Sequence, residues 1–203
     1  LLFCGFGGVV TVAIAAIILR LCLCRFRLGL AARGAFRLGL AFGRVDQRAL
    51  FAVRLGRCLL LLGKVGTGKT HLACGIANRL LRRMSRRAVY RTVGDILIGI
   101  RASYSNRDEE SETELLRPIL GADLLILDEV GATKPSEFEL ATLYRIINGR
   151  YESCLPTVIV SNLAATELGE AIGERCFDRI KEGGAVVVPF SWASARFLSC
   201  LCG

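Results

Sequence analysis

From residue 59 onward, strand-like segments alternate along the chain with segments of helical periodicity. Strand-like segments occupy residues 59–62, 88–93, 123–129, 157–160 and 185–188, and the first consists of four leucines. After that first segment, Leu72, Ile76 and Leu80 recur at the spacing that places side chains on one face of a helix. Strands that alternate with helices predict an α/β fold with a parallel sheet and helices on both of its faces.

The remaining helices are predicted over residues 95–105, 111–120, 136–151, 166–171 and 174–181, with a short one over 49–55 before the first strand. Two of them begin with a recognisable signal. Ser111 is followed by Glu114, and Ser136 by Glu139, at the spacing of an N-terminal capping box. The acidic stretch before Ser111 is predicted to be a polar connection.

A glycine-rich segment joins the first strand to the first long helix. It matches the phosphate-loop motif G-x-x-x-x-G-K-[ST], with Gly63 at its start and Lys69 and Thr70 at its end. Glycines permit positive φ and bring backbone N–H groups close to phosphate oxygens. The helix N-terminus and the Lys69 ammonium add positive charge, and the Thr70 hydroxyl is a ligand for Mg²⁺. The alternative is a glycine-rich turn that contains Lys-Thr by chance, but the strand and helix on either side favour a phosphate site.

The residues expected to surround the phosphates are Gly63, Lys64, Val65, Gly66, Thr67, Gly68, Lys69, Thr70 and His71.

Two further strands end in polar residues. Asp128 and Glu129 close the segment 123–129, and Asn162 follows the segment 157–160. Because ligands bind beyond the carboxyl ends of parallel strands, Asp128 is a candidate Mg²⁺ ligand and Glu129 a candidate base for the attacking water. Asn162 is placed to contact the γ-phosphate or that water. The alternatives are a simple loop start for the two acids and an Asx turn for Asn162.

The basic residues of the chain are concentrated near its N-terminus. The 203 residues carry a net charge of +9, but residues 1–57 hold nine arginines and one acid, which leaves only +1 for the remainder. Residues 1–19 carry no charge and just reach the length of a membrane-spanning helix. The sequence FRLGLA then occurs twice, ten residues apart. Three interpretations of residues 1–57 stay open: membrane or lipid contact, a nucleic-acid-binding arm, or a segment without an evolved fold.

Nine cysteines are scattered along the chain, and the only histidine is His71. An odd number of scattered cysteines does not suggest a disulfide framework, and the two Cys-x-Cys pairs lack the wider spacing of most zinc sites. The composition therefore indicates thiols in a reducing compartment, and we expect a cytoplasmic protein.

The motifs together resemble AAA+ ATPases of the DnaC/IstB type, which include bacterial and phage helicase loaders and transposon helper ATPases. The matching segments come in family order: GKVGTGKTHLA (63–73), LLILDEVG (124–131), TVIVSN (157–162), GERCFDRI (173–180) and FSWASAR (190–196). The last two are more similar to helicase loaders than to transposon helpers. The resemblance implies a RecA-like P-loop core with little or no C-terminal lid, over residues 58–196.

The resemblance also implies roles for particular residues. Lys69 and Thr70 match the Walker A residues, Asp128 and Glu129 the Walker B pair, and Asn162 sensor 1. Further matches are Arg179 to an arginine finger that acts on a neighbouring subunit, with Arg175 in the same run, and Arg196 to the sensor 2 arginine. The implied ligands are ATP and Mg²⁺, and the implied partners are a replicative helicase, single-stranded DNA and further copies of the chain.

Two segments depart from the family pattern. Residues 1–57 have no recognisable helicase-gripping domain, and the tail 197–203 is apolar where loaders end polar. The most favoured function is a slow, partner-stimulated ATPase that acts as a nucleotide switch in helicase loading. The alternatives are a transposition helper ATPase and, from a different class, a non-catalytic adaptor attached to DNA or membrane through residues 1–57.

Overall fold

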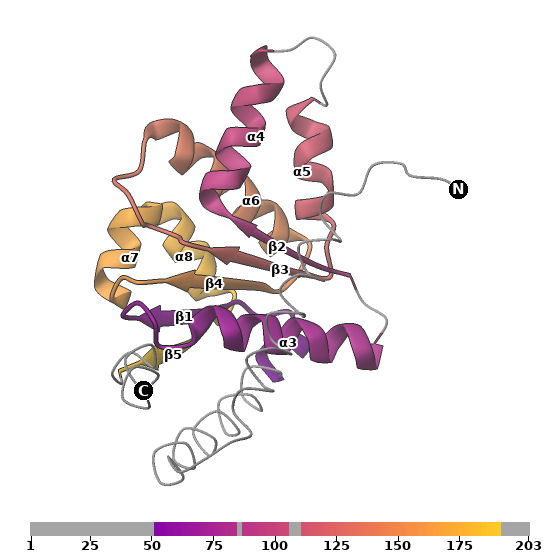
Figure 1. Cartoon of the computed structure of the whole chain (residues 1–203), viewed down its shortest axis with the longest axis vertical. Coiled ribbons are helices and arrows are strands. Elements are labelled where there is room, and N and C mark those ends of the chain that lie inside the picture. The colour runs from indigo at the N-terminus through magenta and orange to yellow at the C-terminus, as the bar shows by residue number, and fades with distance from the viewer. Residues whose placement is uncertain (1–50, 85–86, 106–110, 192–203) are drawn as a thin grey trace, which may run out of the picture.

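The computed structural model describes residues 51–84, 87–105 and 111–191 (Figure 1). Residues 1–50, the tail 197–203 and Arg196 therefore lie outside the described part of the chain. Among the described residues, no helix is long and apolar enough to cross a membrane. The proposed domain boundaries at residues 57 and 196 stay a prediction.

Five parallel strands form one sheet. In chain order they are β1 (Leu59–Gly63), β2 (Ala88–Thr92), β3 (Leu124–Asp128), β4 (Thr157–Ser161) and β5 (Val186–Phe190). In space the order is β2-β3-β4-β1-β5, so the strand before the glycine-rich loop lies between β4 and β5. The parallel sheet predicted from the sequence is confirmed.

The helices are α3 (Lys69–Met84), α4 (Val93–Ser105), α5 (Glu112–Leu120), α6 (Glu137–Glu152), α7 (Ala165–Ile172) and α8 (Glu174–Glu182). Figure 1 shows α3 along one face of the sheet and α4, α5 and α6 over the other. Residues 51–54 form a further helical turn, in which Val53 is buried against the α3 side.

Side chains alternate between the two faces along each strand, as strand geometry requires. Leu59 and Leu61 pack with α3, whereas Leu60 and Leu62 pack in the cluster that contains residues of α4 to α8. β1, β3 and β4 are buried on both faces, which explains why their sequences are continuously apolar rather than alternating.

Both predicted helix starts are present. The Ser111 side chain accepts a hydrogen bond from the backbone N–H of Glu114, whose carboxylate in turn accepts one from the backbone N–H of Ser111. The Ser136 side chain accepts from the backbone N–H of Glu139. β5 runs to Phe190, two residues further than predicted, through Pro189; its edge position tolerates a residue without an N–H group.

Candidate functional site

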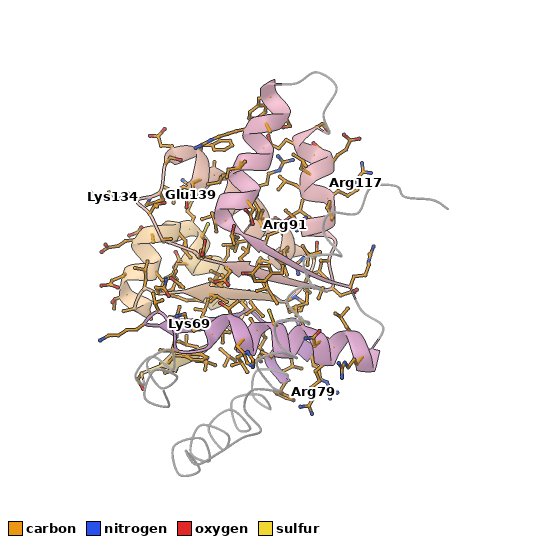
Figure 2. All side chains as sticks on the ribbon, in the orientation of Figure 1. Lys69, Arg79, Arg91, Arg117, Lys134 and Glu139 are labelled. Atoms are coloured by element: carbon orange, nitrogen blue, oxygen red, sulfur yellow. The ribbon has the colours of Figure 1, made fainter. Side chains whose placement is uncertain are left out.

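Three adjacent strands bring the candidate residues to one edge of the sheet. β3, β4 and β1 are neighbours, and each ends at this edge, in Asp128, Ser161 and Gly63. The loop after β1 leads directly into α3, whose first residue is Lys69. Figure 2 shows Lys69 at the start of α3, whereas Arg79 lies further along the same helix. The edge therefore carries the phosphate-loop lysine together with the candidate acids.

The loop backbone takes the conformation that the motif predicts. Gly63, Gly66 and Gly68 have φ of 143°, 79° and 92°, in the region that side chains disfavour. A Cβ on Gly63 would lie 2.3 Å from the carbonyl oxygen of Phe190, so only glycine fits between β1 and β5. The buried Thr67 hydroxyl donates to the carbonyl of Lys64 at 2.8 Å and closes the loop.

Lys69 is 6% exposed, and its ammonium lies inside the loop. Its Nζ donates to the carbonyl oxygens of Gly63 at 2.6 Å and Lys64 at 2.8 Å, and to Oδ1 of Asn162 at 2.9 Å. Burial lowers the pKa of Lys69, and the nearby Asp128 carboxylate opposes that shift. A cation is thus held at the centre of the loop, in contact with the residue predicted as sensor 1.

Asp128, like Lys69, takes part in three hydrogen bonds at this edge. Its Oδ2 accepts hydrogen bonds from the hydroxyls of Thr70 and Tyr90, each at 2.8 Å, and its Oδ1 accepts from the backbone N–H of Glu129 at 2.8 Å. Asp128 as a whole is only 6% exposed. Burial and the Asp128 carboxylate raise the pKa of Tyr90 far above its usual value, so its hydroxyl is protonated and neutral.

Glu129 and Asn162 are exposed next to this buried carboxylate. Glu129 has φ of 59°, which is unusual for a residue with a side chain and turns the chain sharply after β3. The buried Ser161 hydroxyl donates to the carbonyl of Val130 at 2.6 Å and so ties the turn after β3 to the end of β4. These bonds fix the backbone that carries Glu129 and Asn162.

Not all predicted residues meet at this edge. His71 is exposed on the first turn of α3. Arg175 is exposed near the start of α8. Arg179 forms an ion pair with Glu182 at 2.9 Å, and its guanidinium lies 5.4 Å from the ring centroid of Tyr151 near the end of α6. The described contacts of Arg179 are therefore with residues of α8 and α6, and none of them is with the phosphate loop.

The sequence analysis predicts Tyr90 only as part of a strand and does not predict its contact with Asp128. That contact depends on β2 lying beside β3 in the sheet. The only hint in the sequence is that a tyrosine, whose hydroxyl needs a hydrogen-bond partner when buried, occurs in an otherwise apolar part of a strand.

The chemistry of the donor set fits a nucleotide with magnesium. Thr70 Oγ1 and Asp128 Oδ2 are 2.8 Å apart. Adjacent ligands of an octahedral Mg²⁺ with bonds of about 2.1 Å are separated by about 3 Å, and magnesium at nucleotide sites uses one or two carboxylates together with phosphates and water. Thr70 and Asp128 are the residues that would hold the ion, with the phosphates along the loop and Lys69.

The fold and this edge together define a P-loop NTPase of the AAA+ class. The chain belongs to the family of IstB-like ATP binding proteins, whose sequence model matches residues 45–180. The motif resemblance is thereby confirmed at the level of the family.

Curated relatives include the replicative helicase loader DnaC of Escherichia coli K12, which is 37% identical over 134 residues. That alignment covers 66% of this chain and 54% of the loader, so the chain spans about half the length of this relative. The DnaC of Buchnera aphidicola subsp. Baizongia pistaciae is 34% identical over the same share of each chain.

Solved structures agree on the fold. The crystal structure of the DnaC helicase loader has a TM-score of 0.61 at 22% identity and covers 70% of this chain and 88% of that one. AMPPCP-bound DnaA from Aquifex aeolicus has a TM-score of 0.62 at 24% identity, with 84% and 50% covered. At these identities the likeness establishes the α/β core alone.

Proposed function

We propose that this chain binds ATP with Mg²⁺, hydrolyses it slowly, and uses the nucleotide as a switch in loading a replicative helicase. The observation that carries the proposal is the contact between Thr70 and Asp128 at 2.8 Å, beside the Lys69 ammonium at the centre of the loop. Membership of an ATP-binding family supports adenine over guanine.

Each residue has a defined task under this proposal. Lys69 donates to the β- and γ-phosphate oxygens, and the loop N–H groups hold the remaining phosphate charge. Bound Mg²⁺ would neutralise charge on the phosphates. Glu129 is exposed at the turn after β3, where its carboxylate can orient the attacking water and accept its proton. Asn162 contacts the γ-phosphate or that water.

Arg179 and Arg175 act on the site of a neighbouring copy of the chain. Arg179 lies over Tyr151 and makes no described contact with its own loop, which supports action between subunits, because arginine fingers are often supplied from another chain. We propose a homo-oligomer on this ground. Arg196, outside the described residues, is assigned the sensor 2 role by its motif alone.

Helicase loading is proposed from the relatives. This chain aligns with about half of each DnaC relative, and both relatives are named replicative helicase loaders. The same proposal includes a replicative helicase and single-stranded DNA as partners and the cytoplasm as the location. The family's IstB-like description favours, as a second candidate, a helper ATPase in transposition.

The first test is ATP turnover by the full chain. Removing a general base typically slows a reaction by about 10²- to 10⁴-fold, so Glu129→Gln should lose at least 100-fold in turnover while it still binds ATP. Lys69→Ala should lose ATP binding itself. Glu137→Gln, which changes an exposed glutamate in the first turn of α6, is the matched control and should behave like wild type. A folded chain that binds no ATP would support the adaptor alternative instead.

A mixing experiment tests the proposed arginine finger. Arg179→Ala subunits keep Glu129, and Glu129→Gln subunits keep Arg179, so each mutant alone is inactive. Random one-to-one mixing should restore about a quarter of the wild-type turnover, because about one interface in four joins an intact base to an intact finger. No recovery in a mixture that does co-assemble would mean that Arg179 does not act on the site of a neighbouring copy.

Helicase loading is tested by comparing the same variants with purified replicative helicase and with transposase. Nucleotide-dependent delivery of the helicase onto single-stranded DNA, lost in Lys69→Ala, is the expected result. Binding to a transposase alone would support the second candidate.

A further inference from the structure

Tyr90 makes a contact that no motif of the chain includes. Its hydroxyl donates to Oδ2 of Asp128 at 2.8 Å, and Thr70 donates to the same oxygen at the same distance. A carboxylate oxygen has two in-plane lone pairs, so these two hydroxyls occupy both. The second oxygen, Oδ1, is fixed by the backbone N–H of Glu129.

Strand register explains why Tyr90 reaches this carboxylate. Tyr90 is paired with Ile126 in the parallel register of β2 and β3, and Asp128 lies two residues further along β3. Residues two apart share a face of the sheet, so Tyr90 and Asp128 both point toward α3. The ring is partly buried and packs against the apolar cluster on the α3 face of the sheet, which contains Ala77 and Ile126, and this contact holds the hydroxyl in place.

A neutral hydroxyl is suited to orient a metal-binding carboxylate. Lysine or arginine at this position would also donate to Asp128, but its positive charge would repel a divalent cation. Tyrosine donates a hydrogen bond without that charge. Partners of this kind, which do not touch the metal, set the orientation of ligating carboxylates.

We propose that Tyr90 is a positioning residue for the Mg²⁺ of bound ATP. If the Thr70 oxygen bound the metal, one lone pair of Asp128 Oδ2 would be released, and the Tyr90 hydrogen bond would keep the carboxylate from rotating out of place. Asp128 is nearly excluded from solvent, so water does not readily replace this bond. This inference rests on the proposed ATP site and adds a residue to it.

The test separates metal binding from nucleotide binding. Full-length wild type, Tyr90→Phe and Tyr104→Phe are titrated with the fluorescent analogue mant-ATP, first in EDTA and then at increasing Mg²⁺. Tyr90→Phe keeps the ring and removes only the hydroxyl. Tyr104→Phe is matched, because the Tyr104 hydroxyl also donates to a carboxylate, that of Glu112, near the end of α4.

In Tyr90→Phe, affinity for metal-free mant-ATP should stay within about twofold of wild type. The reason is that the described hydrogen bond of the Tyr90 hydroxyl goes to Asp128, and not to Lys69 or to the groups that Lys69 contacts. The Mg²⁺ concentration at half-maximal response should rise about 10-fold, the usual loss when a partner of a metal ligand is removed. Turnover should fall at low Mg²⁺ and recover at saturating Mg²⁺. Tyr104→Phe should match wild type in all three measurements.

Three outcomes would overturn the inference. An unchanged Mg²⁺ midpoint in Tyr90→Phe means that the hydroxyl does not position Asp128. An equal loss of metal-free and Mg²⁺-dependent binding means that Tyr90 only supports the fold. A wild-type chain that binds no mant-ATP at all overturns the proposed function itself, and this inference with it.

Discussion

Arg150 offers the sharpest test of what holds this fold together. The side chain lies on α6, is 0% exposed and contacts no carboxylate in any described ion pair. Its guanidinium donates instead to five oxygens on three segments, at 2.7 to 3.1 Å: the carbonyls of Ile119, Leu120, Ala122 and Pro156 and the hydroxyl of Thr157. Arg150 thus joins the end of α5 to the starts of β3 and β4.

The expected cost of Arg150→Ala follows from these bonds. A net contribution of about 1 kcal/mol for each would give a loss of about 5 kcal/mol. Two effects reduce it: water can enter the space that is left, and removing the guanidinium removes a desolvated charge. Burial lowers the pKa of Arg150 to about 10, because loss of water around the guanidinium disfavours its charged form. We therefore expect the free energy of unfolding to fall by about 2–4 kcal/mol.

Urea unfolding followed by circular dichroism measures this loss. Arg145→Ala is the matched control on the same helix: Arg145 pairs with Glu112 at the surface, its side chain is 46% exposed, and such pairs contribute less than about 1 kcal/mol. Arg150→Lys should fall between the two, because an ammonium has three donors for five acceptors. The reasoning is refuted if Arg150→Ala loses no more stability than Arg145→Ala.

Three further substitutions test local features of the fold. Gly131→Ala should cost about 1–3 kcal/mol in thermal unfolding, because φ is 72° and the new Cβ would lie 2.6 Å from Leu163, whereas Gly99→Ala, in open space on α4, should be neutral or stabilising. Ser136→Ala removes a helix cap and should lower stability by about 1 kcal/mol in urea; no change would mean that the cap is dispensable. Burial raises the pKa of Cys176 from 9.0 to about 11, so between pH 9 and 11 the unfolded chain releases a proton that the folded chain keeps. Wild-type stability should therefore fall across that range by up to about 2 kcal/mol more than that of Cys176→Ala, and parallel pH curves would contradict this.

Local sequence signals predict most of the helices and strands, and they also predict which candidate residues lie together at the phosphate loop. Ser111 and Ser136 marked helix starts correctly because capping depends only on residues three apart. The phosphate loop was predicted in the same way, since its glycines, lysine and threonine are contiguous. Asp128 and Asn162 were brought to the loop by a general property of parallel sheets, that the carboxyl ends of the strands share an edge.

Features that depend on strand order and burial could not be predicted in this way. Tyr90 and Asp128 are 38 residues apart, and their contact requires β2 to lie beside β3 in one particular register. Alternating strands and helices do not determine that order. Arg150 resembles any other arginine near a helix end, and its burial depends on the turns after α5 and α6, which only the folded chain brings together.

The hydrogen bonds of the Lys69 ammonium connect the loop to Asn162, directly after β4. Its three protons meet three acceptors, at 2.6, 2.8 and 2.9 Å, so a phosphate oxygen that binds the ammonium must replace one of them. Gly63 is paired with Phe190 of β5, and the carbonyl of Lys64 accepts the Thr67 hydrogen bond, so the backbone that carries both carbonyls is fixed. Asn162 Oδ1 ends a rotatable, exposed side chain, so it is the acceptor that yields. Under the proposed function, phosphate binding at the loop should therefore release the Asn162 amide from Lys69 and free it to contact the γ-phosphate or the attacking water.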